Sequence, residues 1–149
     1  MYDKNAFFLE RYKYILLRKQ HLNEVTFKIA AIYQVLLLSL AAGQYNVVIL
    51  RKNLTINGEM ALFFSKCLMT MLIALSALIL TLLAGGIFSW IKYRKDEADI
   101  ELAVHGNTRP PVKPLSIFRW YETYLGVIVM IVLFGWIYTY NTHISIMLS

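Results

Sequence analysis

The residues that could carry chemistry are few and lie far apart in the sequence. The three histidines, His21, His105 and His143, fall in separate segments, and the one cysteine, Cys67, excludes an internal disulfide and a cysteine-based metal site. The chain lacks a glycine-rich phosphate loop, a His-Glu-x-x-His pair and a nucleophile elbow. We therefore expect no catalytic residue, no metal site, no cofactor and no enzymatic activity.

The densest group of ionisable residues lies between residues 92 and 101, where an acidic run follows the basic residues Lys92, Arg94 and Lys95. Lys95 and Asp99 are four residues apart, the spacing of ion pairs along one helix. This pattern is typical of a helix surface in water. We expect the acidic run to be solvated, with docking of a partner as the alternative; its members are Asp96, Glu97, Asp99 and Glu101.

Other polar candidates lie inside an uncharged run, residues 29–50. Helical periodicity places Tyr33 and Gln44 on one face with Leu37 and Leu40, whereas Gln34, Ser39 and Asn46 lie elsewhere around the helix. An unpaired amide in hydrocarbon costs several kcal/mol, so such side chains face protein or water. The candidates for lining a pore, or for hydrogen bonds between helices, are Tyr33, Gln34, Gln44 and Asn46.

Three uncharged runs organise the chain: residues 29–50, 68–90 and 123–149. A helix over 68–90 is about 35 Å long, which is enough to cross a hydrocarbon core about 30 Å thick. Of the 149 residues, 58% are apolar and 16% are charged, and one soluble domain of this size could not bury three such runs. The sequence predicts an all-α integral membrane protein with three transmembrane helices preceded by an N-terminal amphipathic helix.

We expect one membrane domain over residues 1–149. Its predicted parts are a cytosolic amphipathic helix (1–24), span one (25–50), an external loop (51–59), span two (60–91), a cytosolic helix with a proline-rich spacer (92–116), span three (117–141) and an external tail (142–149).

Several residues are assigned local roles within these parts. Gly106 is expected to end the helix that extends span two. The hydroxyls of Ser76 and Thr81 are expected to bond to their own helix. Small residues that permit close helix packing are Gly43, Gly85 and Gly86. Aromatic residues expected to gather at one membrane interface are Trp90, Tyr93, Trp120, Tyr121 and Tyr124.

The distribution of basic residues predicts the orientation. The net charge is +6, and twelve of the fifteen Lys and Arg residues lie in the segment through Lys28 or in residues 92–122. Both segments are therefore placed in the cytosol, with the C terminus on the opposite side of the membrane. Because these residues flank the spans, they indicate lipid or partner contact and not nucleic acid binding. The contact candidates are Arg11, Lys13, Arg18, Lys19, Arg94, Lys95, Arg109 and Lys113.

The N-terminal sequence ERYKYILLRKQHLNEVTFKIAAIYQVLLLSLAAG resembles the start of the SLATT-type membrane effectors of bacterial conflict and anti-phage operons. The resemblance covers about residues 8–104: a basic, tyrosine-containing helix, a first span, a short loop, a second span and a helical cytosolic extension. The chain departs from the family where a proline-rich spacer and a third span follow. The resemblance implies an oligomeric pore that compromises the inner membrane when a cytosolic sensor fires, and it carries no catalytic residue.

Three functions are consistent with these sequence patterns. The first is an oligomeric inner-membrane pore or membrane-disrupting effector of a bacterial defence system, since the spans hold no buried charge for proton-coupled transport and three helices cannot enclose a pathway in a monomer. The second is a non-conducting sensor or scaffold that recruits a soluble cytosolic partner encoded nearby. The third is a phage holin-like protein, whose usual topology is the reverse of this one. The lipid bilayer and a second copy of the chain are expected partners.

Overall fold

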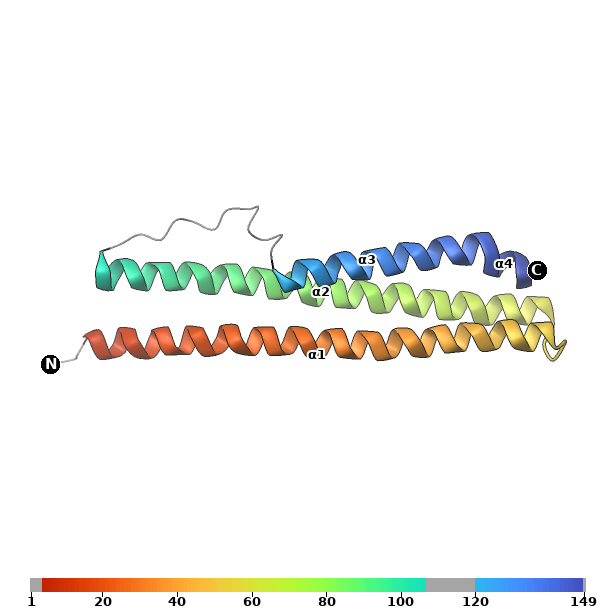
Figure 1. Ribbon diagram of the computed structural model, residues 1–149, viewed down its shortest axis with the longest axis horizontal. Coiled ribbons are helices and arrows are strands. Elements are labelled where there is room, and N and C mark those ends of the chain that lie inside the picture. The colour runs from red at the N-terminus through yellow and green to blue at the C-terminus, as the bar shows by residue number, and fades with distance from the viewer. Residues whose placement is uncertain (1–3, 107–119, 149) are drawn as a thin grey trace. The chain divides into compact units, whose positions relative to one another are not determined.

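The computed structural model describes residues 4–106 and 120–148, and nearly all of these residues are helical (Figure 1). Helix α1 runs over Lys4–Lys52, α2 over Gly58–His105 and α3 over Tyr121–Thr139. A π-helical turn, η2, follows at Tyr140–Ile144, and a short helix, α4, at Ser145–Leu148. The described residues include no β-strand, and the predicted all-α class is confirmed.

Three segments are long and apolar enough to cross a membrane: Phe7–Lys52, Gly58–Ala103 and Tyr121–Met147. In the most apolar part of these segments, only 11%, 28% and 11% of the residues, respectively, are buried within the chain. Most apolar side chains therefore point outward, whereas a helix of a water-soluble protein buries its apolar face. This outward apolar surface supports the predicted multi-span helical membrane protein.

The N-terminal amphipathic helix is not a separate element, and that part of the prediction is wrong. Residues 4–24 form the first part of α1, which continues without interruption for 49 residues. Neither proline nor glycine occurs between Lys4 and Ala42, so no residue in this stretch breaks the backbone hydrogen bonds. At 1.5 Å per residue α1 is about 74 Å long and extends well beyond a hydrocarbon core of about 30 Å.

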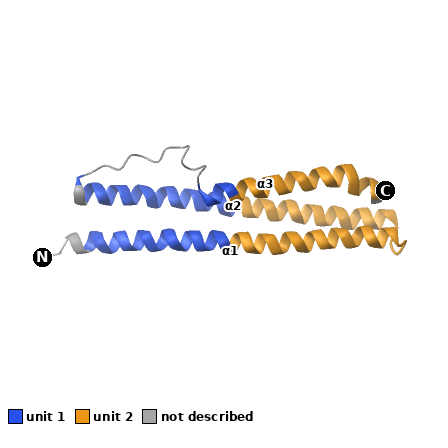
Figure 2. Ribbon diagram, in the orientation of Figure 1, with its two compact units in different colours: residues 1–28, 82–124 blue, residues 29–81, 125–149 orange. Residues whose placement is uncertain are grey.

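The described residues divide into two compact units, which Figure 2 shows in different colours. Unit 1 comprises Met1–Lys28 and Leu82–Tyr124, and unit 2 comprises Ile29–Thr81 and Leu125–Ser149. Unit 1 thus pairs the first part of α1 with the last part of α2 and the first residues of α3. Unit 2 contains the remaining parts of these three helices, together with η2 and α4.

In unit 2 a tight turn joins α1 to α2. The side-chain Oδ1 of Asn57 accepts a hydrogen bond of 2.8 Å from the backbone N–H of Met60, which caps the first turn of α2. Leu54 adopts a positive φ of 58°. Because α1 continues to Lys52 and α2 begins at Gly58, the connection is shorter than the predicted loop over 51–59. The turn holds the two helices antiparallel, and Val47 packs against Ala61 beside it.

The other helix ends agree with the sequence predictions to different degrees. Gly106, with a φ of 68°, donates its backbone N–H to the carbonyl of Leu102 at 3.0 Å, so the predicted end of α2 is confirmed. Helix α3 begins at Tyr121, and residues 117–119 of predicted span three lie outside the described residues. Residues 142–148, predicted as a tail, continue the helical path of α3 through η2 and α4.

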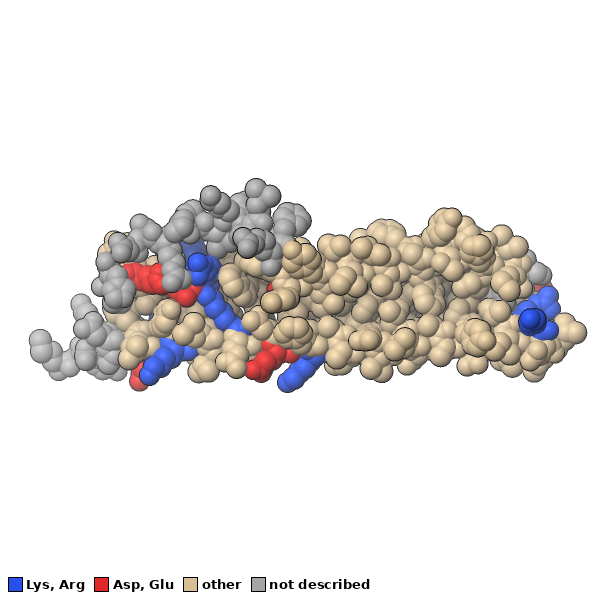
Figure 3. Space-filling model, viewed as in Figure 1, with Lys and Arg blue, Asp and Glu red and all other residues tan. Residues whose placement is uncertain are grey.

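Charged side chains are distributed differently in the two units. On the face shown in Figure 3, unit 1 carries both acidic and basic side chains, whereas the charges of unit 2 gather near the turn between α1 and α2. The charged residues of unit 2 are Arg51, Lys52, Glu59 and Lys66. The remainder of unit 2 is therefore uncharged, as expected of a segment that lies in lipid.

Candidate functional site

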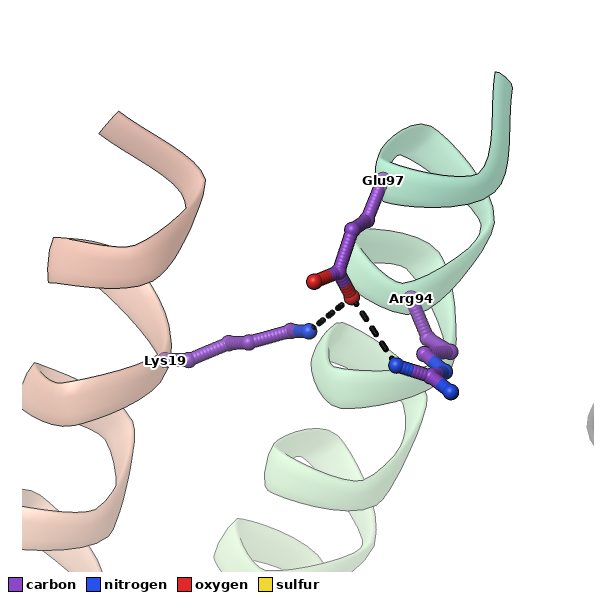
Figure 4. A network of polar contacts seen from close by, with 3 residues as sticks. All are labelled: Lys19, Arg94 and Glu97. Carbon is purple, nitrogen blue, oxygen red and sulfur yellow. Dashed lines mark hydrogen bonds and ion pairs between the residues drawn. The ribbon is translucent and has the colours of Figure 1, made fainter. Parts of the chain in front are cut away.

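A buried ion cluster connects α1 and α2 in unit 1 (Figure 4). The carboxylate of Glu97, whose side chain is only 5% exposed, forms an ion pair with the Lys19 ammonium and another, at 3.1 Å, with the Arg94 guanidinium. The Lys19 side chain is 14% exposed and that of Arg94 is 34% exposed. Two cations thus compensate one buried acid, which offsets the cost of removing its charge from water.

The expectation that the acidic run is solvated is wrong for Glu97. Asp99 is exposed and Asp96 is half-buried, but Glu97 faces α1 and is buried. Its partner Lys19 lies 78 residues earlier in the sequence. No local pattern could reveal this contact, because the spacing within 92–101 defines only neighbours on the same helix.

An aromatic cluster lies beside the ion cluster in unit 1. The Lys19 ammonium lies 5.0 Å from the ring centroid of Trp90, a cation–π contact. The Trp90 ring in turn packs against Trp120, with ring centroids 4.3 Å apart. Phe27 and Tyr121 form a second ring contact, at 6.0 Å. The predicted gathering of aromatic residues is confirmed for Trp90 and Trp120, which bring the start of α3 against α2.

A second buried carboxylate belongs to Glu122, in the first turn of α3. Its Oε1 accepts a hydrogen bond of 3.3 Å from the hydroxyl of Thr26, which also lies 3.0 Å from the carbonyl of Leu22. The positive end of the α3 dipole helps to stabilise a carboxylate at this position.

A Cβ added to Gly86 would lie 3.8 Å from the Glu122 Cγ, so the predicted close packing holds at Gly86, whereas Gly85 has no such neighbour within 4 Å. No role was predicted for Glu122, although its place in the first turn of a helix was the available signal.

In unit 2 two neutral hydrogen bonds join α1 to α2. The hydroxyls of Tyr33 and Ser76 lie 3.3 Å apart, and the Gln44 amide donates to the Ser65 hydroxyl at 2.5 Å. All four side chains are buried. Ser76 therefore bonds across the helices, contrary to the expectation, whereas Thr81 does bond to its own helix, at the Ala77 carbonyl.

These contacts separate the polar candidates of residues 29–50 into two classes. Tyr33 and Gln44 hold helices together, as one of the two open interpretations predicted, and nearby Gly43 packs closely on Leu68. Gln34 and Asn46 are exposed and have no hydrogen-bond partner among the described residues. The predicted division of faces around α1 is thereby confirmed.

A groove of about 420 Å³ lies between α1 and α3 in unit 2. Its lining includes Gln44, and the amide oxygen of Gln44 has no hydrogen-bond partner among the described residues. Small residues line both sides of the groove, and two aromatic side chains flank them. The groove is lined by Ala41, Tyr45 and Val48 from α1 and by Gly135, Trp136 and Thr139 from α3.

The predicted basic contact residues also divide into classes. Lys19 and Arg94 bind Glu97 within the chain. Arg18 donates to the Tyr14 hydroxyl at 2.8 Å and stacks on its ring. The exposed members are Arg11, Lys13, Arg18 and Lys95, whereas Arg109 and Lys113 lie outside the described residues. The surface left for lipid or partner contact is therefore smaller than predicted.

Within residues 4–106 and 120–148, no group of three or more His, Cys, Asp or Glu side chains could hold a metal ion. No protein-family model matches the chain, and neither the curated proteins nor the solved structures include a match.

Proposed function

We propose that this chain is the subunit of an oligomeric pore that permeabilises a bacterial inner membrane in response to a cytosolic signal. The observation that carries the proposal is the outward position of Gln34 in an uncharged run of α1. An amide in hydrocarbon without a partner costs several kcal/mol, so it favours a location against protein or water. In a pore formed by several subunits, Gln34 would contact either a neighbouring subunit or the water in the pore.

The paired helices of unit 1 would receive the signal. The ion pair between Lys19 and Glu97 fixes α1 to α2, and the contact of Trp90 with Trp120 attaches the start of α3 to the same pair. A partner that separates α1 from α2 in this unit, or holds them more tightly, would change how the three helices pack there. The distribution of basic residues supports a cytosolic location for this unit. The resemblance to membrane effectors of bacterial conflict systems supports a role in defence.

Release of a fluorescent dye from vesicles tests this proposal. The purified protein is reconstituted into vesicles with the products of its neighbouring genes, and we expect dye release that falls at least tenfold in a Gln34→Leu variant. Ser39→Ala is the matched control, because the Ser39 hydroxyl already bonds to the Val35 carbonyl at 2.9 Å and should not contribute to a pore. If the wild-type protein releases neither dye nor ions with these partners present, the pore proposal is refuted.

A second function, a scaffold that recruits a soluble protein, is favoured by the apolar surface near the start of α1. Phe7, Leu9 and Leu17 are each more than half exposed there. A partner that covers them would be retained in a pull-down from the native cell. Substitution of these three residues by serine should abolish its recovery if the chain is a scaffold, and such a scaffold would release no dye.

A further inference from the structure

We infer that the groove between α1 and α3 in unit 2 binds a second copy of this chain, and that Gln34 forms a hydrogen bond to that copy. The inference rests on the proposed function, since it identifies the surface through which the pore assembles. It is carried by two independent features of one face of α1, namely the shape of the groove and the position of the amide.

The shape of the groove suits a helix. Ala41, Gly135 and Thr139 are small, and small residues at a membrane helix surface allow another backbone to approach closely. A Cβ added to Gly135 would meet no atom within 4 Å, so the space above this residue is open. Tyr45 and Trp136 form apolar walls that a helix could pack between. Among residues 4–106 and 120–148, none occupies this space.

Gln34 does not line the groove itself but lies along α1 in line with Ala41, which does. It precedes Ala41 by seven residues, and residues seven apart are nearly aligned along an α-helix. A primary amide both donates and accepts hydrogen bonds, so Gln34 is complementary to the same residue of another copy. A lipid acyl chain could fill the groove but would leave this amide without a partner. The combination of groove and amide therefore favours a second copy.

Photo-crosslinking from the wall of the groove tests the identity of the occupant. A benzophenone amino acid replaces Tyr45, which is 67% exposed, and in a control chain it replaces Phe63, which is 63% exposed on α2 and does not line the groove. After illumination in membranes we expect adducts between two copies of the chain from position 45, at least fivefold more abundant than from position 63. Adducts of position 45 with lipid or with another protein would overturn the inference, as would equal yields at the two positions.

Filling the groove tests the same inference by a different measurement. A leucine at Gly135 should fit the single chain, because its Cβ has open space, but should exclude a second copy. Gly85→Leu is the matched control, since Gly85 is equally open and lies in unit 1. We expect Gly135→Leu to shift the purified protein from oligomer to monomer by native mass spectrometry, with unchanged helix content by circular dichroism. An oligomer retained in Gly135→Leu would overturn the inference.

The failures of the two proposals are distinguishable. If position 45 crosslinks two copies but the wild-type protein releases no dye, the interface is supported and the pore is refuted. If the wild-type protein releases dye but position 45 gives no adducts between copies, the pore is supported and this interface is refuted.

Discussion

Replacing Lys19 by methionine is expected to destabilise the protein much more than replacing Arg94 by methionine. The Lys19 side chain is 14% exposed and binds a carboxylate that is 5% exposed, so the substitution removes a charge-assisted hydrogen bond of about 1.5–3 kcal/mol. Loss of the contact with Trp90 adds about 0.5–1 kcal/mol. Arg94 is 34% exposed and pairs with Glu97 on its own helix, an interaction of about 0.3–0.5 kcal/mol.

A double-mutant cycle sharpens this prediction. Glu97→Leu alone leaves the Lys19 ammonium enclosed without its acid and should cost about 3 kcal/mol. When Lys19→Met is added, neither member of the pair remains, and an apolar pair of similar volume should cost less than about 1 kcal/mol. The free energy of unfolding is measured in mixed micelles by titration with a denaturing detergent, followed by circular dichroism. Equal losses for Lys19→Met and Arg94→Met, or additive losses in the double variant, would refute the assignment of Lys19 as the main partner of Glu97.

Three further predictions concern unit 2 and the orientation of the chain. Asn57→Ala removes the cap of α2 and should lower the free energy of unfolding by about 1 kcal/mol, whereas Asn53→Ala, in the same turn, should change it little. Gln44→Leu removes the hydrogen bond to Ser65 and should cost about 1 kcal/mol, and Ser65→Ala should then add no further loss. Alkaline phosphatase fused after Ser149 should be active in cells and green fluorescent protein dark; a fluorescent fusion would contradict the predicted orientation.

Local patterns in the sequence predicted the three long apolar helices and the end of α2. Three uncharged runs identified the long apolar helices, and Gly106 marked the end of α2. Periodicity also separated Tyr33 and Gln44 from Gln34 before any contact was known. These predictions succeeded because each depends on residues within a few turns of one helix. The continuity of α1 follows from the same kind of evidence, the absence of proline and glycine, although charge and composition change along it.

Contacts between distant segments could not be predicted in this way. Glu97 meets Lys19 across 78 residues, and Glu122 meets Thr26 across 96 residues. Glu97 was expected to be a solvated surface residue, and no contact was predicted for Glu122. Which turn of α1 faces α2 depends on the register of the two helices, and that register is set by packing along their whole length and not by any short motif.

The contacts between helices differ in chemical character between the two units, and this difference is an independent argument for lipid around unit 2. In unit 2 the helices are joined by neutral groups, Tyr33 with Ser76 and Gln44 with Ser65. In unit 1 the contacts described above use the charged side chains of Glu97 and Glu122. A buried ion pair must recover the hydration energy of two charges, which is harder far from water, whereas a neutral hydrogen bond loses much less. Hydropathy identified the apolar runs from composition alone. The difference between neutral and charged contacts depends instead on which side chains meet across two helices. Both observations favour lipid around the uncharged runs where they fall in unit 2, namely residues 29–50, 68–81 and 125–149.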